Sequence, residues 1–388
     1  TLLQYAYLKR PYALEPALAD RMPEREVYAY EGELSPPAQE SDLEQEIGVP
    51  VPEAEPPAER KTVRREAFRY RITIRQGLRF QDDPCFEATG GKGREVRSDD
   101  FLYAFKRIAD PLVTCPVRAI LGEKVAGLNG FYFANRKRIQ GQRAAGLEPE
   151  TDYSIPVTGL RRIDDSTFEV CLTEKYPQFL YWLAMPFTTP IPREAVEHYD
   201  PVRFPGREAF RDHPVGTGAY VLKAGEYRKG QRMVLERNPN FREERYPAEG
   251  EPGDREIGLL ADAGKLLPLV DTWVFTTVKE SIPHWNLFRQ GYLDTSGIPR
   301  EFFDRVITPE GGLSRSMEEK GVRLYRAKEL TTYYFAFNMD DPVVGKNVKL
   351  RQAVSSAIHT AEYIELFLNG LGEVAQSPLP PGLFLLLF

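Results

Sequence analysis

The most constraining feature of the sequence is residues 213–241, where two short apolar runs flank a polar, glycine-containing connection. The runs at 219–222 and 233–236 have the length of strands, and the Asn-Pro-Asn sequence at 238–240 stops the second one, because proline fixes φ and donates no hydrogen bond. Gly216 and Gly218 precede the first run, where positive φ or a close backbone approach is expected. By itself the stretch predicts an antiparallel hairpin.

The length and the net charge of the chain limit the number of domains and the kinds of partner that we expect. A chain of 388 residues has room for about two or three domains. The net charge is −6 and the lysine and arginine residues are scattered, so we expect no nucleic-acid partner, because phosphate recognition needs a concentrated basic surface. The four histidines have no metal-ligand spacing, and we expect no metal and no cofactor.

The three cysteines, Cys85, Cys115 and Cys171, form no CxxC pair and allow at most one disulfide within the chain. A Cys85–Cys115 bridge in an oxidising compartment and two free thiols both fit the sequence. This alternative stays open at the level of sequence.

The two ends do not read as natural termini. Residues 1–5 lack the charged start, apolar run and cleavage site of a signal peptide, and residues 383–388 are far shorter than the about 20 residues that span a bilayer. We expect the chain to be cut at both ends.

Several segments have readable patterns. Residues 31–66 are rich in Pro, Glu and Ala and predict a mobile surface loop, whereas residues 68–75 alternate apolar and polar side chains as a half-buried strand does. Ser98 is expected to cap a helix with Asp99 and Asp100 in its first turn, which explains this acidic pair better than acid–base catalysis does.

The remaining pattern alternates between strands and helices, so we predict an α/β fold. Strands are expected within 160–172, at 273–278, 323–325 and 333–338; helices at 176–183, 193–199, 285–291, 302–306 and 347–358, with a loop and a short helix at 125–134.

The order of these patterns resembles the extracytoplasmic solute-binding proteins of peptide ABC transporters, family 5. The phrases that carry the resemblance are YRITIRQGLRFQD (70–82), SDDFLYAFKRIADP (98–111), YPQF and PIPREAVE (176–179 and 190–197), PVGTGAY with LERNPNF (214–220 and 235–241), LFRQGYLD (287–294), and TTYYFAFN with NVKLRQAVSSAI (331–338 and 347–358). The resemblance covers nearly all of residues 2–383 except the 31–66 insert.

The resemblance implies a periplasmic-binding-protein-like two-lobe clamshell of type II with an extra small lobe and an incomplete C-terminal lobe. The implied small lobe covers 1–158, the main lobe 159–330, and the start of a second main lobe 331–388. It also implies a monomer, periplasmic or extracytoplasmic and with an optional lipid anchor. Such a protein binds peptides without catalysis and delivers them to an ABC transporter permease at the membrane.

The resemblance also implies where a ligand would bind. In the run from Tyr333 to Asn338, alternation puts Tyr334, Ala336 and Asn338 on one face of a strand, and some family members have a carboxylate at the position of Ala336. Tyr333 is a further predicted ligand contact, although ring packing against a sheet explains this residue better. The loop Ser296, Gly297 and Ile298 is the second implied contact, with a plain turn as the alternative. Val117 and Arg118 are weaker candidates.

Three alternative functions remain at this level. The ligand can be another solute, such as a sugar oligomer, a metal chelate or haem. The chain can be an enzyme, although it has no GxSxG, HExxH or Cys–His arrangement. It can also be a degenerate, truncated remnant without transport function.

Overall fold

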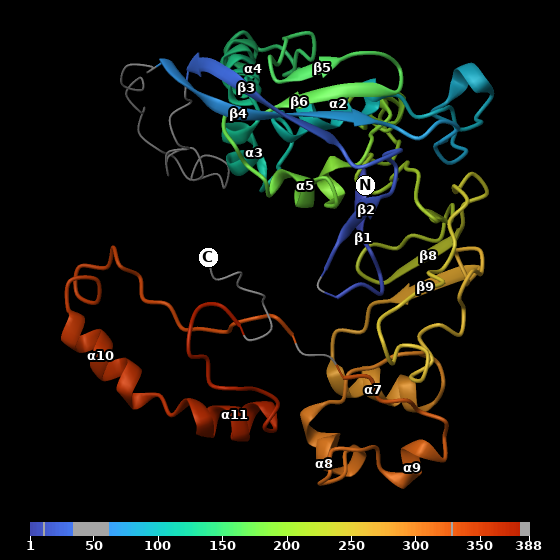
Figure 1. The fold of residues 1–388 in the computed structure, drawn as a ribbon, viewed down its shortest axis with the longest axis vertical. Helices are drawn as coiled ribbons and strands as arrows, with labels where there is room; N and C mark the ends of the chain where they lie inside the picture. Colours follow the sequence, from blue (N-terminus) through green and yellow to red (C-terminus); the bar gives the residue numbers. More distant parts are fainter. Residues whose placement is uncertain (11, 34–61, 327–328, 381–388) are drawn as a thin grey trace. The chain divides into compact units, whose positions relative to one another are not determined.

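The computed structural model describes residues 1–10, 12–33, 62–326 and 329–380. These residues form two compact units, Thr1–Phe275 and Thr276–Phe388, which we call the first and the second unit (Figure 1). Most of the predicted 31–66 loop lies outside the described residues, and the lobe boundaries predicted at 158 and 330 stay a prediction. None of the described helices is long and apolar enough to cross a membrane.

The main sheet of the first unit is antiparallel, with strand order β3-β4-β6-β5. Its strands are β3 (Glu24–Glu33), β4 (Thr62–Thr73), β5 (Leu160–Arg162) and β6 (Thr167–Cys171). The predicted alternation is confirmed, because Phe68, Tyr70 and Ile72 are buried on one face of β4. The predicted loop is wrong at both of its ends: residues 31–33 pair with 62–64, because each strand supplies the other with backbone partners that composition cannot reveal.

Helices cover the apolar face of this sheet. Helix α2 (Ser98–Ile108) contributes Phe101, whose ring stacks on that of Phe168 at a centroid distance of 5.4 Å. Helices α3 (Arg118–Lys124) and α4 (Leu128–Ala144) follow it. The prediction of a loop with a short helix at 125–134 is wrong, since α4 has 17 residues. Gly130 and Gly141, weak helix formers, hide its length in the sequence.

The rest of the first unit consists of short elements and a second sheet. The short elements are β1 (Leu3–Tyr5), β2 (Leu14–Pro16), η1 (Glu87–Thr89), α5 (Phe179–Trp182), η2 (Pro186–Thr188) and α6 (Arg193–His198). The sheet β7-β8-β9 contains β7 (Tyr220–Leu222), β8 (Arg232–Arg237) and β9 (Thr272–Thr276). The antiparallel register Tyr220↔Arg237 confirms the predicted hairpin. In the connection of this hairpin, Gly225 and Gly230 have positive φ. Gly216 and Gly218, which precede the hairpin, do not have positive φ.

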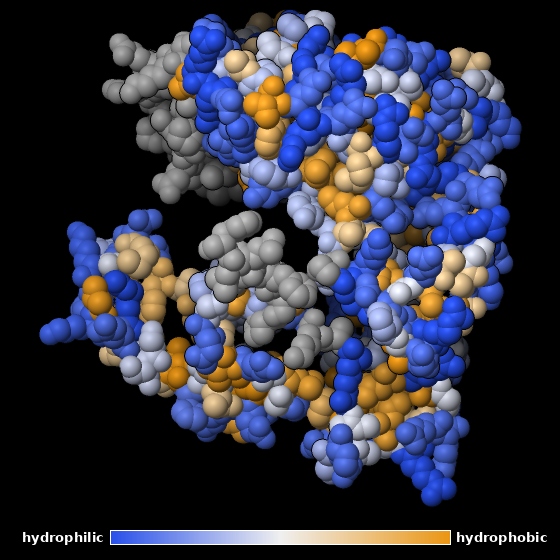
Figure 2. Space-filling view, in the orientation of Figure 1, coloured by the Kyte–Doolittle hydropathy of each residue, from blue (hydrophilic) through white to orange (hydrophobic). Residues whose placement is uncertain are grey.

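After β9, the named elements that the structure describes in the second unit are all helices. Helices α7 (Ser281–Arg289), η3 (Arg300–Phe302), α8 (Phe303–Val306) and α9 (Arg315–Glu318) enclose a small core of Trp285, Val306 and Met317. Helices α10 (Val348–Ala357) and α11 (Thr360–Leu368) follow. The predicted N-terminus of α10 is confirmed, since Asn347 Oδ1 accepts the Leu350 N–H at 3.0 Å. Apolar side chains lie exposed on α11 (Figure 2).

Two predicted strands of the second unit are not formed. Residues 323–325 and 333–338 have no strand partner within the described part of the chain, and Tyr333 and Tyr334 are 81% and 80% exposed. Apolar alternation can only mark a segment as suited to a sheet, whereas a strand also needs a neighbour for its N–H and C=O groups.

The outer face of the main sheet has a buried carboxylate that ties three strands together. Glu169 of β6 lies 2.8 Å from an Arg71 guanidinium nitrogen of β4 and 3.3 Å from one of Arg161 of β5. The Glu169 side chain is buried, so water cannot replace these partners.

We therefore expect Glu169→Gln to lower the free energy of unfolding by about 1.5–3 kcal/mol, the range for hydrogen bonds to charged groups. Urea unfolding measures this loss. The control is Glu66→Gln, because Glu66 forms an exposed pair with Lys175 and should cost less than about 0.5 kcal/mol. Equal losses in the two variants would contradict the argument.

Candidate functional site

In the first unit, the family phrases converge on Gly216. Gln81, just beyond β4, donates its backbone N–H to Gly216 O at 2.9 Å and accepts the Gly216 N–H on Oε1 at 3.1 Å. Its amide also donates to Pro214 O at 3.3 Å. The buried Gln81 thus forms hydrogen bonds with both the N–H and the C=O of Gly216, just before the hairpin. Gly216 makes this pairing through its backbone alone: it has no left-handed φ, and open space surrounds the position that a Cβ would occupy.

A buried carboxylate lies next to this pairing. Asp83 accepts hydrogen bonds from the Cys85 N–H at 2.9 Å and from the Tyr199 hydroxyl at 2.9 Å, and His213 Nε2 lies 3.0 Å from its other oxygen. The His213 and Tyr199 rings stack at 4.0 Å. On the other side of the imidazole, His213 Nδ1 lies 3.3 Å from Glu208.

The electrostatics of this cluster favour an ion pair. Burial would raise the pKa of the Asp83 carboxyl, but hydrogen bonds from His213, Cys85 and Tyr199 outweigh burial and lower it. The bond to Asp83 raises the pKa of the His213 imidazole above its ordinary value of 6.5, against the opposing effect of burial. Burial raises the pKa of the Tyr199 phenol. Both shifts favour the charged form of the group concerned, so each partner stabilises the charge on the other.

A third set of bonds fixes the end of the hairpin. Asn238 donates to Gly218 O at 2.8 Å, and Asn240 donates to Phe80 O at 2.9 Å and to Asp82 at 2.8 Å. Hydrogen bonds from Lys92, Gly93 and Asn240 lower the pKa of Asp82 to about 2. Because these groups bond to one another, the cluster is suited to holding segments together. We call Gln81, Asp82, Asp83, His213 and Asn240 the latch residues.

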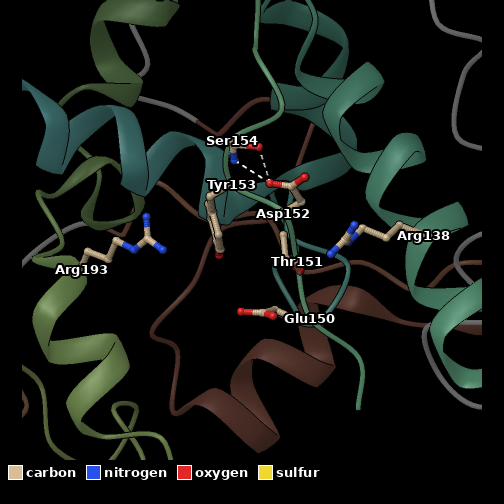
Figure 3. Close-up of a pocket in the computed structure, with 7 residues that line it drawn as sticks. All are labelled: Arg138, Glu150, Thr151, Asp152, Tyr153, Ser154 and Arg193. Carbon is tan, nitrogen blue, oxygen red and sulfur yellow. Dashed lines mark hydrogen bonds between the residues drawn. The ribbon is translucent and has the colours of Figure 1, made fainter. Parts of the chain in front are cut away.

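Two hollows lie on the first unit. One, of about 340 Å³, has Arg138 and Arg193 on opposite sides and Glu150 between them (Figure 3). The Thr151 and Tyr153 hydroxyls donate to Asp110 and fix the loop that lines it. The other, of about 360 Å³, lies between the Cys85–Thr89 segment and α6. None of the predicted ligand residues lines either hollow.

All seven predicted ligand residues lie in the second unit. Ser296 Oγ donates to Gly297 O at 2.8 Å and lies 3.0 Å from His284 Nδ1. Ile298 is half-buried against the Trp285, Val306 and Met317 core, whereas Gly297 is exposed. The loop is therefore anchored at both ends and open at its middle.

The second predicted stretch is open along most of its length. Tyr333, Tyr334, Ala336 and Asn338 are exposed, and Asn338 Oδ1 accepts the Asp340 N–H at 3.1 Å. The predicted division into a ligand face and a packed face is not observed, because no sheet built from the described residues covers the rings.

An aromatic series runs from this stretch toward the first loop. The Phe335 ring meets Tyr363 at 6.4 Å, Tyr363 stacks on Phe367 at 5.0 Å, and the Arg300 guanidinium lies 5.3 Å from the Phe367 ring. Arg300 follows Ile298 by two residues. The structure thus links the two predicted stretches through α11, although it records no direct contact between their described residues.

The predictions for the cysteines and for the helix cap at Ser98 can be compared with the structure. Cys85, Cys115 and Cys171 form no disulfide, so the Cys85–Cys115 bridge is not present in the structure. Asp100 accepts the Arg97 N–H at 2.8 Å, which confirms its capping role, but the helix cap is Arg97 and not Ser98. The described residues contain no cluster of three or more His, Cys, Asp or Glu side chains suited to a metal ion.

The weaker pair of candidates has a packing role. Arg118 is buried with its guanidinium 4.0 Å from the Tyr132 ring, and Val117 is the cap of α3, half-buried against the core. Sequence reasoning did not identify the latch residues or His284 as functional. The sequence features that could have pointed to the latch are the consecutive acids Asp82 and Asp83 and the histidine His213 before the hairpin.

A comparison with known protein families identifies the family of this chain. The family model of bacterial extracellular solute-binding proteins, family 5 (middle), matches residues 54–385, and the chain belongs to this family. This match confirms the predicted resemblance and, with the mixed elements described above, the α/β fold class. Proteins of this family bind substrates and are not catalysts.

Two curated relatives and one solved structure are similar to the chain. The periplasmic oligopeptide-binding protein OppA of Salmonella typhimurium is 34% identical over 149 residues, 38% of this chain and 23% of that protein. The dipeptide-binding protein of Escherichia coli is 23% identical over 331 residues, 84% of this chain and 50% of that protein. A periplasmic oligopeptide-binding protein of Borrelia burgdorferi, OppAIV, has a TM-score of 0.50 at 19% identity, covering 78% of this chain and 47% of that one, and supports the fold alone. The chain spans half or less of the length of each of these proteins.

The Asp83–His213 pair predicts a pH dependence of stability. A histidine whose pKa is raised by folding adds stability that is fully present below its unfolded pKa and is lost as pH rises through the folded pKa. We expect His213→Phe, which retains a ring over Tyr199, to lower the free energy of unfolding by about 1.5–3 kcal/mol at pH 6 and by clearly less at pH 9. Urea unfolding at the two pH values measures the difference.

The matched control is His359→Asn. His359 is 75% exposed and accepts the Glu362 N–H at the start of α11, a capping role that asparagine can take over. Its loss should be small at both pH values. A His213→Phe loss that is constant between pH 6 and pH 9 would exclude the ion pair.

Proposed function

We propose that this chain is the ligand-capturing part of a protein that binds peptides outside the cytoplasm and delivers them to an ABC transporter permease. The observation that carries the proposal is the family match over residues 54–385. The latch supports it, because the family phrases that are distant in sequence meet there in one hydrogen-bonded cluster.

The proposed ligand contacts are the two stretches of the second unit, Ser296–Gly297–Ile298 and Tyr333–Tyr334 with Ala336 and Asn338. They suit a peptide because they offer backbone groups and exposed rings. Backbone hydrogen bonds are common to all peptides and place no demand on sequence, whereas rings contact side chains over a large area.

The proposed protein works without catalysis and without a cofactor, as a monomer in the periplasm or another extracytoplasmic place, with or without a lipid anchor. The domain division into a small lobe (1–158), a main lobe (159–330) and the start of a second main lobe (331–388) is part of the same proposal. Nucleic acid is not among the proposed partners, because the net charge of −6 repels phosphate.

The test is equilibrium dialysis of the chain against a random mixture of tripeptides to pentapeptides, followed by mass spectrometry of what the denatured protein releases. We expect intact peptides. Released haem or a sugar oligomer, offered in parallel, would replace the peptide proposal with another solute. Cleaved peptides would indicate an enzyme, and no retained solute would overturn the binding function of this chain.

Substitution of one exposed tyrosine tests the proposed contacts. Tyr334→Ala should weaken the affinity for the recovered peptide about tenfold, which corresponds to about 1.4 kcal/mol, because it removes a ring that the peptide would cover. Tyr325→Ala is the control, since Tyr325 is 84% exposed in the same unit but outside the proposed contacts. Titration calorimetry measures both. Equal affinities in the two variants would remove Tyr334 from the site.

A further inference from the structure

His284 constrains the hydrogen bonding of the Ser296–Ile298 loop. Its Nδ1 lies 3.0 Å from Ser296 Oγ, and Ser296 Oγ donates to Gly297 O at 2.8 Å. A serine hydroxyl has a single proton to donate. Because that proton is directed to Gly297 O, the His284 nitrogen must be the donor, so Nδ1 carries the hydrogen in this arrangement.

The same helix supplies the second anchor of the loop. Trp285, next to His284 on α7, forms the buried centre of the core against which Ile298 packs. Pro299, the residue after Ile298, is also buried. Two consecutive residues of α7 therefore fix the two sides of the loop, one by a hydrogen bond and one by apolar packing.

Between these anchors the loop is open. Gly297 is exposed, and no heavy atom lies within 4 Å of the position that a Cβ would occupy there. Among the hydrogen bonds of the described residues, neither the Gly297 N–H nor the Ile298 N–H has an acceptor. The loop thus has two successive backbone donors without partners, next to a carbonyl that already accepts a hydrogen bond from Ser296.

We propose that His284 is a positioning residue for ligand binding: it holds Ser296 so that the Gly297 and Ile298 N–H groups form a preset pair of donors. Such a pair recognises an oxygen acceptor, a peptide carbonyl or a terminal carboxylate. This inference rests on the proposed function for its ligand, but the ordering of the loop by His284 does not depend on any ligand. Prior ordering matters because a loop fixed before binding loses less entropy on binding.

Two substitutions at position 284 separate the hydrogen bond from the ring. His284→Phe keeps a ring of similar size and removes the donor, whereas His284→Asn places an amide N–H near the position of Nδ1 and removes the ring. Ser296→Ala removes the other partner. The control is Tyr292→Phe, which removes an exposed hydroxyl from the same segment without touching the loop bonds.

The first measurement is the backbone amide order parameter from NMR relaxation in the absence of ligand, in the full chain, because it reports the mobility of an amide that has no hydrogen bond. We expect His284→Phe and Ser296→Ala each to lower the order parameters of residues 296–298 from the rigid range of about 0.85 toward the flexible range of about 0.6, while His284→Asn and Tyr292→Phe leave them unchanged. The double variant His284→Phe/Ser296→Ala should lower them no further than either single variant, because both remove the same bond. Unchanged order parameters in His284→Phe would overturn the positioning role.

The second measurement is calorimetric titration with trialanine. His284→Phe should weaken binding about tenfold and His284→Asn should restore it to within threefold. Weakening that asparagine does not restore, or equal affinity in all variants, would overturn the role of the hydrogen bond. If the unsubstituted chain binds no trialanine and no peptide from the random mixture, the proposed function fails, and the order parameters still decide whether His284 orders the loop.

Discussion

The buried carboxylate of Asp83 is the interaction on which the arrangement of the first unit depends. A charge in a protein interior is costly unless it is paired and hydrogen-bonded. Asp83 meets that requirement only when three segments arrive together: its own turn at Cys85, the end of α6 at Tyr199, and the entrance to the hairpin at His213. Misplacing any one of these segments would remove one partner of the buried carboxylate, which stabilises this arrangement relative to its alternatives.

The patterns that predicted the fold correctly are those in which local sequence and burial agree. The alternation of Phe68, Tyr70 and Ile72 places three side chains in the core, and the turn residues between 222 and 233 force a hairpin. The first turn of α2 was predictable for the same reason, because Asp100 interacts with a backbone group only three residues away. Each of these features depends on neighbours that are close in sequence.

The errors have the opposite origin. Residues 31–33 and 62–64 look like loop by composition, and only their mutual pairing makes them strands. The run Tyr333–Asn338 looks like a strand, and only a neighbour could make it one. In both cases the deciding partner is a backbone group elsewhere in the chain, which single-residue propensities do not encode. The same limit applies to the latch: Asp83 and His213 are separated by 130 residues, so neither residue could be assigned a role from its own surroundings.

Signature residues and proposed ligand contacts therefore have different physical roles in this chain. The latch residues are bonded to one another within the first unit, and their donors and acceptors leave little for a ligand. The proposed contacts in the second unit are instead exposed: Gly297 has open space around it, and the rings of Tyr333 and Tyr334 face water. A family phrase such as PVGTGAY thus reports a shared fold, because its residues hold segments together. We propose that the solute is selected by residues that the fold leaves open, since the latch residues already bond to one another.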